Sequence, residues 1–175
     1  MGVVVKGSNH TPAPQGVHQC VCVDVVDMGL QKQKFGNEPE RQVQKIRLIW
    51  QLDEVDETKG RRFLVSKWYT ASLHEKATLR KDLQSWRGRP FTSDELKGFD
   101  LDNVLGANGQ INIVHKQKED GGIFGAVEAI MPLAKGMVKI GPVDYVREQD
   151  RPKDQQHEPG SDEELQAAID DSVPF

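Results

Sequence analysis

Two strand-like runs joined by a short polar connection constrain the fold of this chain more than any other feature. The first run, residues 41–54, alternates between apolar and polar side chains, which is the two-residue period of a half-buried β-strand. The apolar side chains that share one face are Ile46, Leu48, Trp50 and Leu52. Lys45 and Arg47 fall on the opposite face. The second run, residues 61–70, is rich in β-branched and aromatic residues. The pattern predicts a hairpin with one face in the core and cations on the other.

The orientation of the second strand depends on Lys67, because a lysine resists burial unless it is paired. Phe63, Lys67 and Tyr69 share one face, and we expect this face to point outward. Phe63 and Tyr69 would then offer rings on which bases could stack, while Trp68 would lie in the core. A single β-bulge would reverse this assignment and turn Trp68 outward.

Apolar periodicity elsewhere predicts three further strands and one helix. The strands are expected at residues 16–28, 110–115 and 123–133. Ser72 and Glu75 have the spacing of a capping box that opens a helix, and Gly88 ends it. The expected fold class is all-β with this helix between strands three and four, which is the order of the five-stranded OB-fold barrel. An SH3-like barrel and an α+β sandwich remain open alternatives.

Charge divides the chain into a body and a tail. Residues 147–175 hold nine acidic and three basic side chains, a net charge of −6, and the remainder carries +2. The tail is too polar to bury a core, so we expect it to be disordered. We therefore predict an N-terminal arm at 1–15, an OB-fold domain at 16–146 and an acidic tail at 147–175.

The predicted ligand surface follows from the OB-fold, which binds oligonucleotides on strands two and three and on two neighbouring loops. Cations and aromatic rings fall in these segments, as a polyanion with flat bases requires. The candidate nucleic-acid-binding residues are Lys32, Lys34, Phe35, Lys45, Arg47, Arg61, Phe63, Lys67, Tyr69, Lys116 and Lys118. The alternative is a solvated strand face whose lysines keep a sheet edge soluble.

The last residues of the chain, DDSVPF, form a second candidate site. Acidic side chains can steer such a peptide to a partner, proline stiffens it, and the terminal ring can fill an apolar pocket. The candidate partner-binding residues are Asp170, Asp171, Val173, Pro174 and Phe175. A merely solubilising acidic end is the alternative.

This ending resembles the acidic tip of bacterial single-stranded DNA-binding proteins, which end in aspartates and a hydrophobic-Pro-Phe triplet. The body is similar to single-stranded DNA-binding proteins of tailed bacteriophages over most of residues 12–136. The similar stretches include PAPQGVHQC, VVDMGLQ, the segment from SKWYTASLHEK to ELKGFDL, and IMPLAKG. The resemblance implies an OB-fold that coats DNA during replication or recombination, and a tip that recruits replication or repair proteins. Ser172 stands where the bacterial tip often has another acidic residue.

Other chemistry is poorly supported by the sequence. His18, Cys20 and Cys22 could share a strand face, but a zinc site needs about four ligands and no second cluster exists, so buried cysteines are expected. Four carboxylates at residues 53–57 could suggest a metal-dependent nuclease, yet a solvated turn is the simpler interpretation. We expect no enzyme activity, cofactor or metal. No apolar run is long enough for a membrane span, and Cys20 and Cys22 lie too far apart on a strand for an easy disulfide, so a reducing cytoplasm is the expected location.

The sequence thus predicts a protein that binds single-stranded DNA with little sequence preference. An adaptor that uses the OB-fold as a protein-binding scaffold is the main alternative, and an RNA-binding OB module is a closer one. A homo-oligomer is left open.

Overall fold

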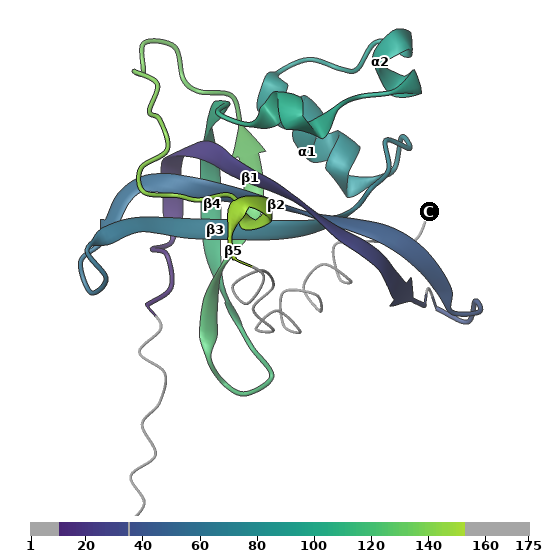
Figure 1. The fold of residues 1–175 in the computed structure, drawn as a ribbon, viewed down its shortest axis with the longest axis horizontal. Helices are drawn as coiled ribbons and strands as arrows, with labels where there is room; N and C mark the ends of the chain where they lie inside the picture. Colours follow the sequence, from purple (N-terminus) through teal and green to yellow (C-terminus); the bar gives the residue numbers. More distant parts are fainter. Residues whose placement is uncertain (1–10, 35, 153–175) are drawn as a thin grey trace, which may run out of the picture.

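The fold is mostly β, with five antiparallel strands in one sheet (Figure 1). The computed structural model describes residues 11–34 and 36–152. The strands are β1 (Gly16–Gln33), β2 (Arg41–Asp56), β3 (Arg61–Thr70), β4 (Asn108–Gln117) and β5 (Ile123–Met131). The expected five strands are confirmed, although β1 runs five residues beyond its predicted end at residue 28.

Strand β1 is shared by the two halves of the sheet, whose order is β3-β2-β1-β4-β5. Its first residues pair with β4, and almost its whole length pairs with β2. Irregular register between Cys22 and Asp24, and again between Asp27 and Leu30, bends the strand as β-bulges do. The end strands β3 and β5 are in contact but share no ladder, so the described strands curl toward a barrel without closing it.

The main core lies between the inner face of this curled sheet and helix α1 (Thr78–Arg87). Helix α1 contributes Leu79, Leu83 and Trp86, which recur at helical spacing. The Trp86 ring meets Trp50 of β2 edge-on, with ring centroids 5.9 Å apart. Gly109 lies directly below Trp86, and a Cβ there would stand only 2.7 Å from the indole nitrogen. A glycine at this position therefore lets the helix pack closely on β4.

Helix α1 begins later than predicted. Its first residue is Thr78, and its N-cap, Ala77, makes no side-chain cap. The Ser72 hydroxyl instead accepts a hydrogen bond from the backbone of His74, so it stabilises a turn before the helix. The predicted end is confirmed, because Gly88 adopts the left-handed conformation that closes a helix.

Two short helical segments connect α1 to β4. Helix α2 (Ser93–Lys97) begins with a capping box in which Thr92 and Glu95 bond to each other's backbone. A 3-10 turn, η1 (Leu101–Val104), follows it. None of the described helices is long and apolar enough to cross a membrane.

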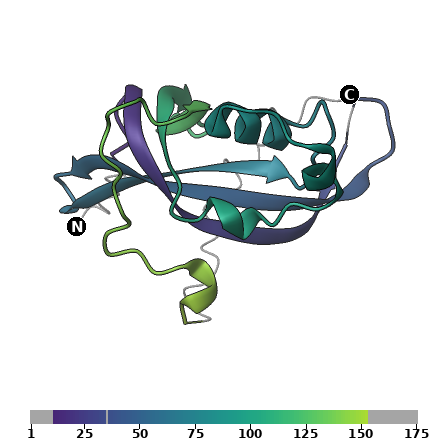
Figure 2. The same ribbon diagram turned by 90° about the horizontal axis from the view of Figure 1, so that it is seen from above.

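The outer face of β1–β3, opposite α1, is crossed by a segment that we name the strap, residues 138–151 (Figures 1 and 2). The strap contains the short 3-10 helix η2 (Glu148–Asp150). Ile140 and Tyr145 of the strap pack against a second, smaller apolar cluster on this face. The members of that cluster are Val21, Val23 and Ile49. The strap therefore covers part of the outer face, while α1 packs on the inner one.

Both predicted domain boundaries fall within packed chain. At the N-terminal side, Ala13 is buried in the core, and its carbonyl oxygen lies 2.8 Å from Nε2 of His115. At the other side, Arg147 and Arg151 belong to the strap. The rest of the predicted arm and tail, residues 1–10 and 153–175, lies outside the described residues.

Candidate nucleic-acid interface

The two faces of β2 are divided as predicted. Leu48 and Trp50 are buried in the main core, and Lys45 and Arg47 alternate with them on the outer face. Lys45 is nevertheless only 1% exposed, and its ammonium donates a hydrogen bond to the Thr70 hydroxyl at 2.7 Å. Burial lowers the pKa of Lys45 to about 8, because an ammonium loses hydration there. Lys45 is therefore an outer-face residue but not an exposed one.

The orientation predicted for β3 is wrong. Phe63 and Tyr69 belong to the main core and are 8% and 2% exposed, so neither ring is a surface platform for bases. Lys67 shares their inner face and is 8% exposed. The reason is Asp82 of α1, whose Oδ2 accepts from the Lys67 ammonium at 3.1 Å and from the Tyr69 hydroxyl at 2.7 Å. The ion pair with this helix carboxylate stabilises Lys67 in its buried position.

Trp68 consequently lies on the outer face, which is the position expected for Tyr69 from the sequence. It stands directly opposite Arg47 in the β2–β3 ladder, so both side chains project from the same side of the sheet. Its ring packs with Met28 and Val26 of β1 in a small cluster and is 4% exposed. The outer face thus carries the cation-beside-aromatic arrangement that the sequence predicted, with Trp68 in the aromatic role.

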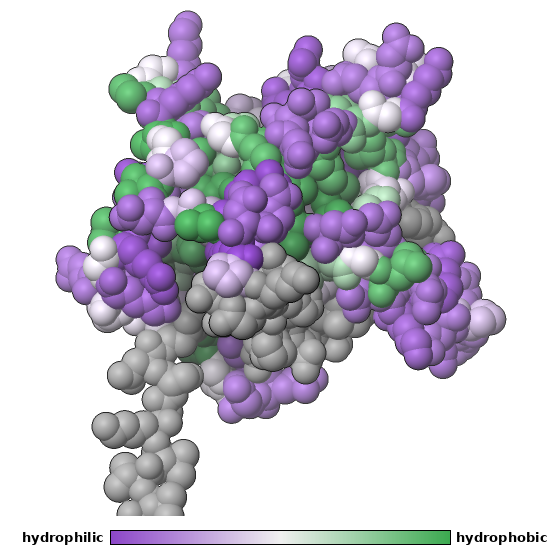
Figure 3. Space-filling model, in the orientation of Figure 1, coloured by the Kyte–Doolittle hydropathy of each residue, from purple (hydrophilic) through white to green (hydrophobic). Residues whose placement is uncertain are grey.

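The remaining predicted cations lie on the hairpin ends. Lys32 and Lys34 are exposed near the β1–β2 connection, and Lys116 is exposed near the β4–β5 connection, where Lys118 is partly exposed. Figure 3 shows hydrophilic side chains gathered over both hairpin ends. These two ends project from the sheet in different directions (Figure 1). The structure therefore does not gather the lysines into one cluster, but sets two pairs at separate edges of the molecule.

Two predicted residues need separate mention. Arg61 is exposed beside the β2–β3 turn, where it pairs in register with Asp56 at the end of the sheet away from the β1–β2 hairpin. Phe35 lies outside the described residues, as do all five candidate residues of the C-terminal tip.

Sequence reasoning missed the strap and the residue that anchors it, Asp24. This carboxylate is 1% exposed and accepts hydrogen bonds from three strap groups: the Tyr145 hydroxyl, the Arg147 guanidinium and the Glu148 amide. Burial and then the bond to Asp24 raise the pKa of Tyr145 well above its usual value. A signal was available in the sequence, since an aspartate in the middle of the apolar run 16–28 requires buried donors.

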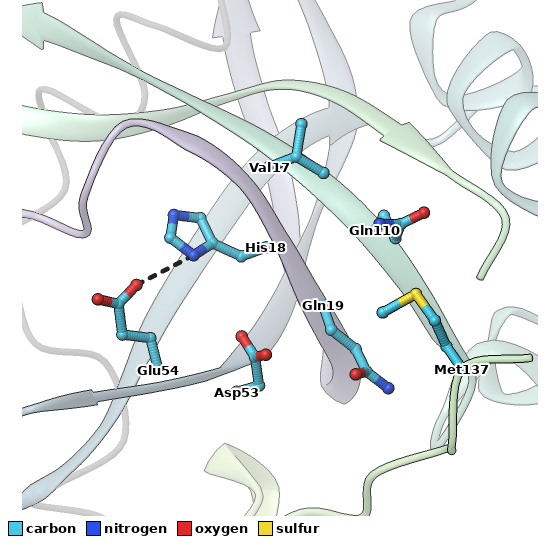
Figure 4. Close-up of a pocket in the computed structure, with 7 residues that line it drawn as sticks. All are labelled: Val17, His18, Gln19, Asp53, Glu54, Gln110 and Met137. Carbon is cyan, nitrogen blue, oxygen red and sulfur yellow. Dashed lines mark ion pairs between the residues drawn. The ribbon is translucent and has the colours of Figure 1, made fainter. Parts of the chain in front are cut away.

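A polar pocket of about 390 Å³ lies beside the start of the strap (Figure 4). Its lining includes His18, Asp53 and Glu54, with Nδ1 of His18 3.1 Å from a Glu54 oxygen. Two carboxylates would repel phosphate groups, so we do not include this pocket in the candidate interface. Within the part of the chain that the structure describes, no group of three or more His, Cys, Asp and Glu side chains could hold a metal ion.

Cys20 and Cys22 are buried as free thiols on the inner face of β1, as the sequence predicted. Burial raises the pKa of both thiols to about 12, which keeps them protonated near neutral pH. They therefore act as small apolar side chains of the core.

Comparisons with known proteins do not identify a family for this chain. No protein-family model matches it, and no curated protein sequence is significantly similar to it.

Proposed function

We propose that this protein binds single-stranded DNA on the outer face of β1–β3, with an OB-type barrel as its scaffold. The observation that carries the proposal is the pairing of Arg47 with Trp68 on that face. A guanidinium can meet a phosphate while an indole beside it stacks on a base, which is how proteins bind single strands without reading sequence.

The strand order supports an OB-type scaffold. β1 stands between β2 and β4, the end strands β3 and β5 are in contact, and α1 lies between β3 and β4 in the chain. A partly open five-stranded barrel of this kind binds its ligand on strands two and three and on the loops between strands one–two and four–five. Lys32, Lys34, Lys116 and Lys118 lie at those two connections.

Because Trp68 is buried, stacking of a DNA base on its ring requires a local rearrangement of the protein. Because the ring is only 4% exposed, a base can stack on it only when the side chains packed over it move aside. Binding is therefore expected to change the surroundings of the indole. Trp50 and Trp86 lie in the main core, so a change in tryptophan fluorescence on binding would report mainly on Trp68.

The experiment compares labelled single-stranded DNA, duplex DNA and single-stranded RNA by fluorescence anisotropy at several salt concentrations. We expect single-stranded DNA to bind most tightly, with affinity that falls as salt rises. Quenching of tryptophan fluorescence should accompany binding in the wild type and be largely lost in Trp68→Phe. Preference for duplex, or no binding to any of the three, would contradict the proposal, and preference for RNA would favour an RNA-binding role.

We further propose that the C-terminal tip, DDSVPF, recruits a partner protein, with Phe175 as its anchor. Acidic residues before the ring would give long-range attraction to a basic pocket on that partner.

A further inference from the structure

The strap is seated on the outer face in a fixed register. The Gln51 side chain donates to the carbonyl of Val143 at 2.7 Å and accepts from its amide at 2.8 Å. Asn108 forms the same pair of bonds with Ile140, at 2.9 and 2.8 Å. Gln51 and Asn108 each bond to both backbone groups of one strap residue, so the strap docks on the sheet in a single register.

Asp24 fixes the far end of the strap. Its carboxylate is 2.8 Å from the Tyr145 hydroxyl, 2.8 Å from the Glu148 amide and 3.2 Å from Nε of Arg147. If the strap left, all three bonds would break together and the apolar cluster under the strap would be exposed to water, and both effects oppose undocking. The strap is therefore expected to stay docked while the protein binds other molecules.

The docked strap brings an aromatic ring and a cation to the outer face beside β2. The guanidinium of Arg151 lies 5.2 Å from the centre of the Tyr145 ring. Tyr145 packs against the cluster that contains Ile49, and Ile49 and Arg47 are two residues apart on the same face of β2, so Arg47 lies near the ring. Nε of Arg151 donates to the carbonyl oxygen of Val146 at 3.0 Å, and Arg147 pairs with Asp24 and with Asp102, 3.8 Å away.

These contacts define a row that crosses from β3 through β2 to the strap. It alternates aromatic and cationic side chains in the order Trp68, Arg47, Tyr145, Arg151. Alternation of this kind suits a polynucleotide, in which bases and phosphates also alternate. The strap also covers Val21 and Ile49, so it closes that part of the face.

We propose that the strap is part of the nucleic-acid surface, with Tyr145 and Arg151 in contact with the single strand beside Arg47 and Trp68. This inference rests on the proposed function. The strap then plays two roles: it supplies two contacts, and it confines the path of the strand to the part of the outer face nearer the β1–β2 hairpin.

The test uses the full-length chain and a labelled oligothymidylate, with affinity measured over a salt series. Arg151→Gln should make the slope of log K against log salt shallower by about 0.7, the value of one lost phosphate contact on a single strand. Lys97→Gln is the matched control, because Lys97 is 81% exposed on α2 and should leave the slope unchanged.

A pair of substitutions separates ring contact from strap docking. Tyr145→Leu removes the ring and should weaken binding about tenfold. Tyr145→Phe keeps the ring but loses the bond to Asp24, so it should lower stability and leave affinity near that of the wild type. Hydrogen exchange of the backbone amides at Ile140 and Val143 reports whether the strap remains docked in each variant.

The outcomes are distinct. If the wild type binds no oligonucleotide, the proposed function fails and the inference fails with it. If the wild type binds, and both Arg151→Gln and Tyr145→Leu match it in affinity and salt slope, the inference is overturned while the function stands. If Tyr145→Phe with a docked strap loses as much affinity as Tyr145→Leu, the ring does not contact the bases, and that part of the inference is overturned.

Discussion

The ammonium of Lys67 on β3 lies 3.1 Å from Oδ2 of Asp82 on α1. The Tyr69 hydroxyl lies 2.7 Å from the same oxygen, so one helix carboxylate holds two side chains of the strand. This contact decides which face of β3 is buried, because it satisfies a lysine that would otherwise be expelled from the inner face.

A double-mutant cycle should reveal this pair as a stabilising interaction. Lys67→Ala, Asp82→Ala and the double variant are expected to give a coupling energy of about 1–3 kcal/mol in urea unfolding. The matched control is the exposed Lys97–Asp94 pair, 3.7 Å apart, whose coupling should stay below about 0.5 kcal/mol. A coupling for Lys67 and Asp82 as small as that of the control would mean that the contact does not orient β3.

The second prediction is that Tyr69 stabilises the core and Trp68 contacts DNA, which reverses the roles expected from the sequence. Tyr69→Ala should lower the free energy of unfolding by about 3–5 kcal/mol, because the ring fills the main core. Trp68→Leu should weaken DNA binding by about 1–3 kcal/mol through lost stacking. Urea unfolding and anisotropy titrations measure the two effects. The assignment fails if Tyr69→Ala folds stably and loses DNA affinity while Trp68→Leu keeps it.

The lysines of the hairpin ends should each contribute to the salt dependence of DNA binding. If Lys32 and Lys34 both meet phosphates, their joint replacement by glutamine should make the slope of log K against log salt shallower by about 1.4. Lys116→Gln should change it by about 0.7. Lys81→Gln on α1, also exposed, is the control and should have no effect. Unchanged slopes in the hairpin variants would remove these hairpins from the interface.

The lowered pKa of Lys45 predicts that the free energy of unfolding depends on pH. Its pKa is about 8 in the folded protein against 10.5 for an ordinary lysine, so between these values the unfolded chain holds a proton that the folded protein has lost. The free energy of unfolding of the wild type should therefore rise, relative to Lys45→Met, as pH increases through this window. Below pH 8 the difference should be flat. A difference that stays flat across the window would mean that Lys45 keeps its charge in the folded protein.

The acidic tail is predicted to compete with DNA. Removal of residues 153–175 takes away seven acidic side chains and one basic one, and leaves the strap intact. A tethered segment of this charge is present at high effective concentration near the cations of the body, so truncation should strengthen DNA binding, most clearly at low salt. Deletion of Phe175 alone should leave DNA affinity nearly unchanged and abolish capture of a partner.

These two outcomes are independent. If truncation leaves affinity unaltered at low salt, the tail does not compete for the DNA surface. If every partner still binds without Phe175, the tip only adds charge.

Local sequence determined much of the sheet and one end of each helix. The two-residue period of 41–54 determined which face of β2 enters the main core, since a one-residue slip would have turned its cations toward α1 in place of Leu48 and Trp50. Gly88 ended α1, and the spacing of Thr92 and Glu95 started α2, because these are steric and hydrogen-bonding effects within a single turn.

Only the tertiary structure decided the face of β3 and the makeup of the candidate site. The burial of Lys67 depends on a carboxylate 15 residues away in the chain, and the seat of the strap joins Gln51 to Val143 across 92 residues. Neither partner belongs to the periodic pattern around the residue that it satisfies. A sequence pattern indicates which side chains are of a type that is usually buried. The tertiary structure supplies the particular donor or acceptor that stabilises a buried polar group.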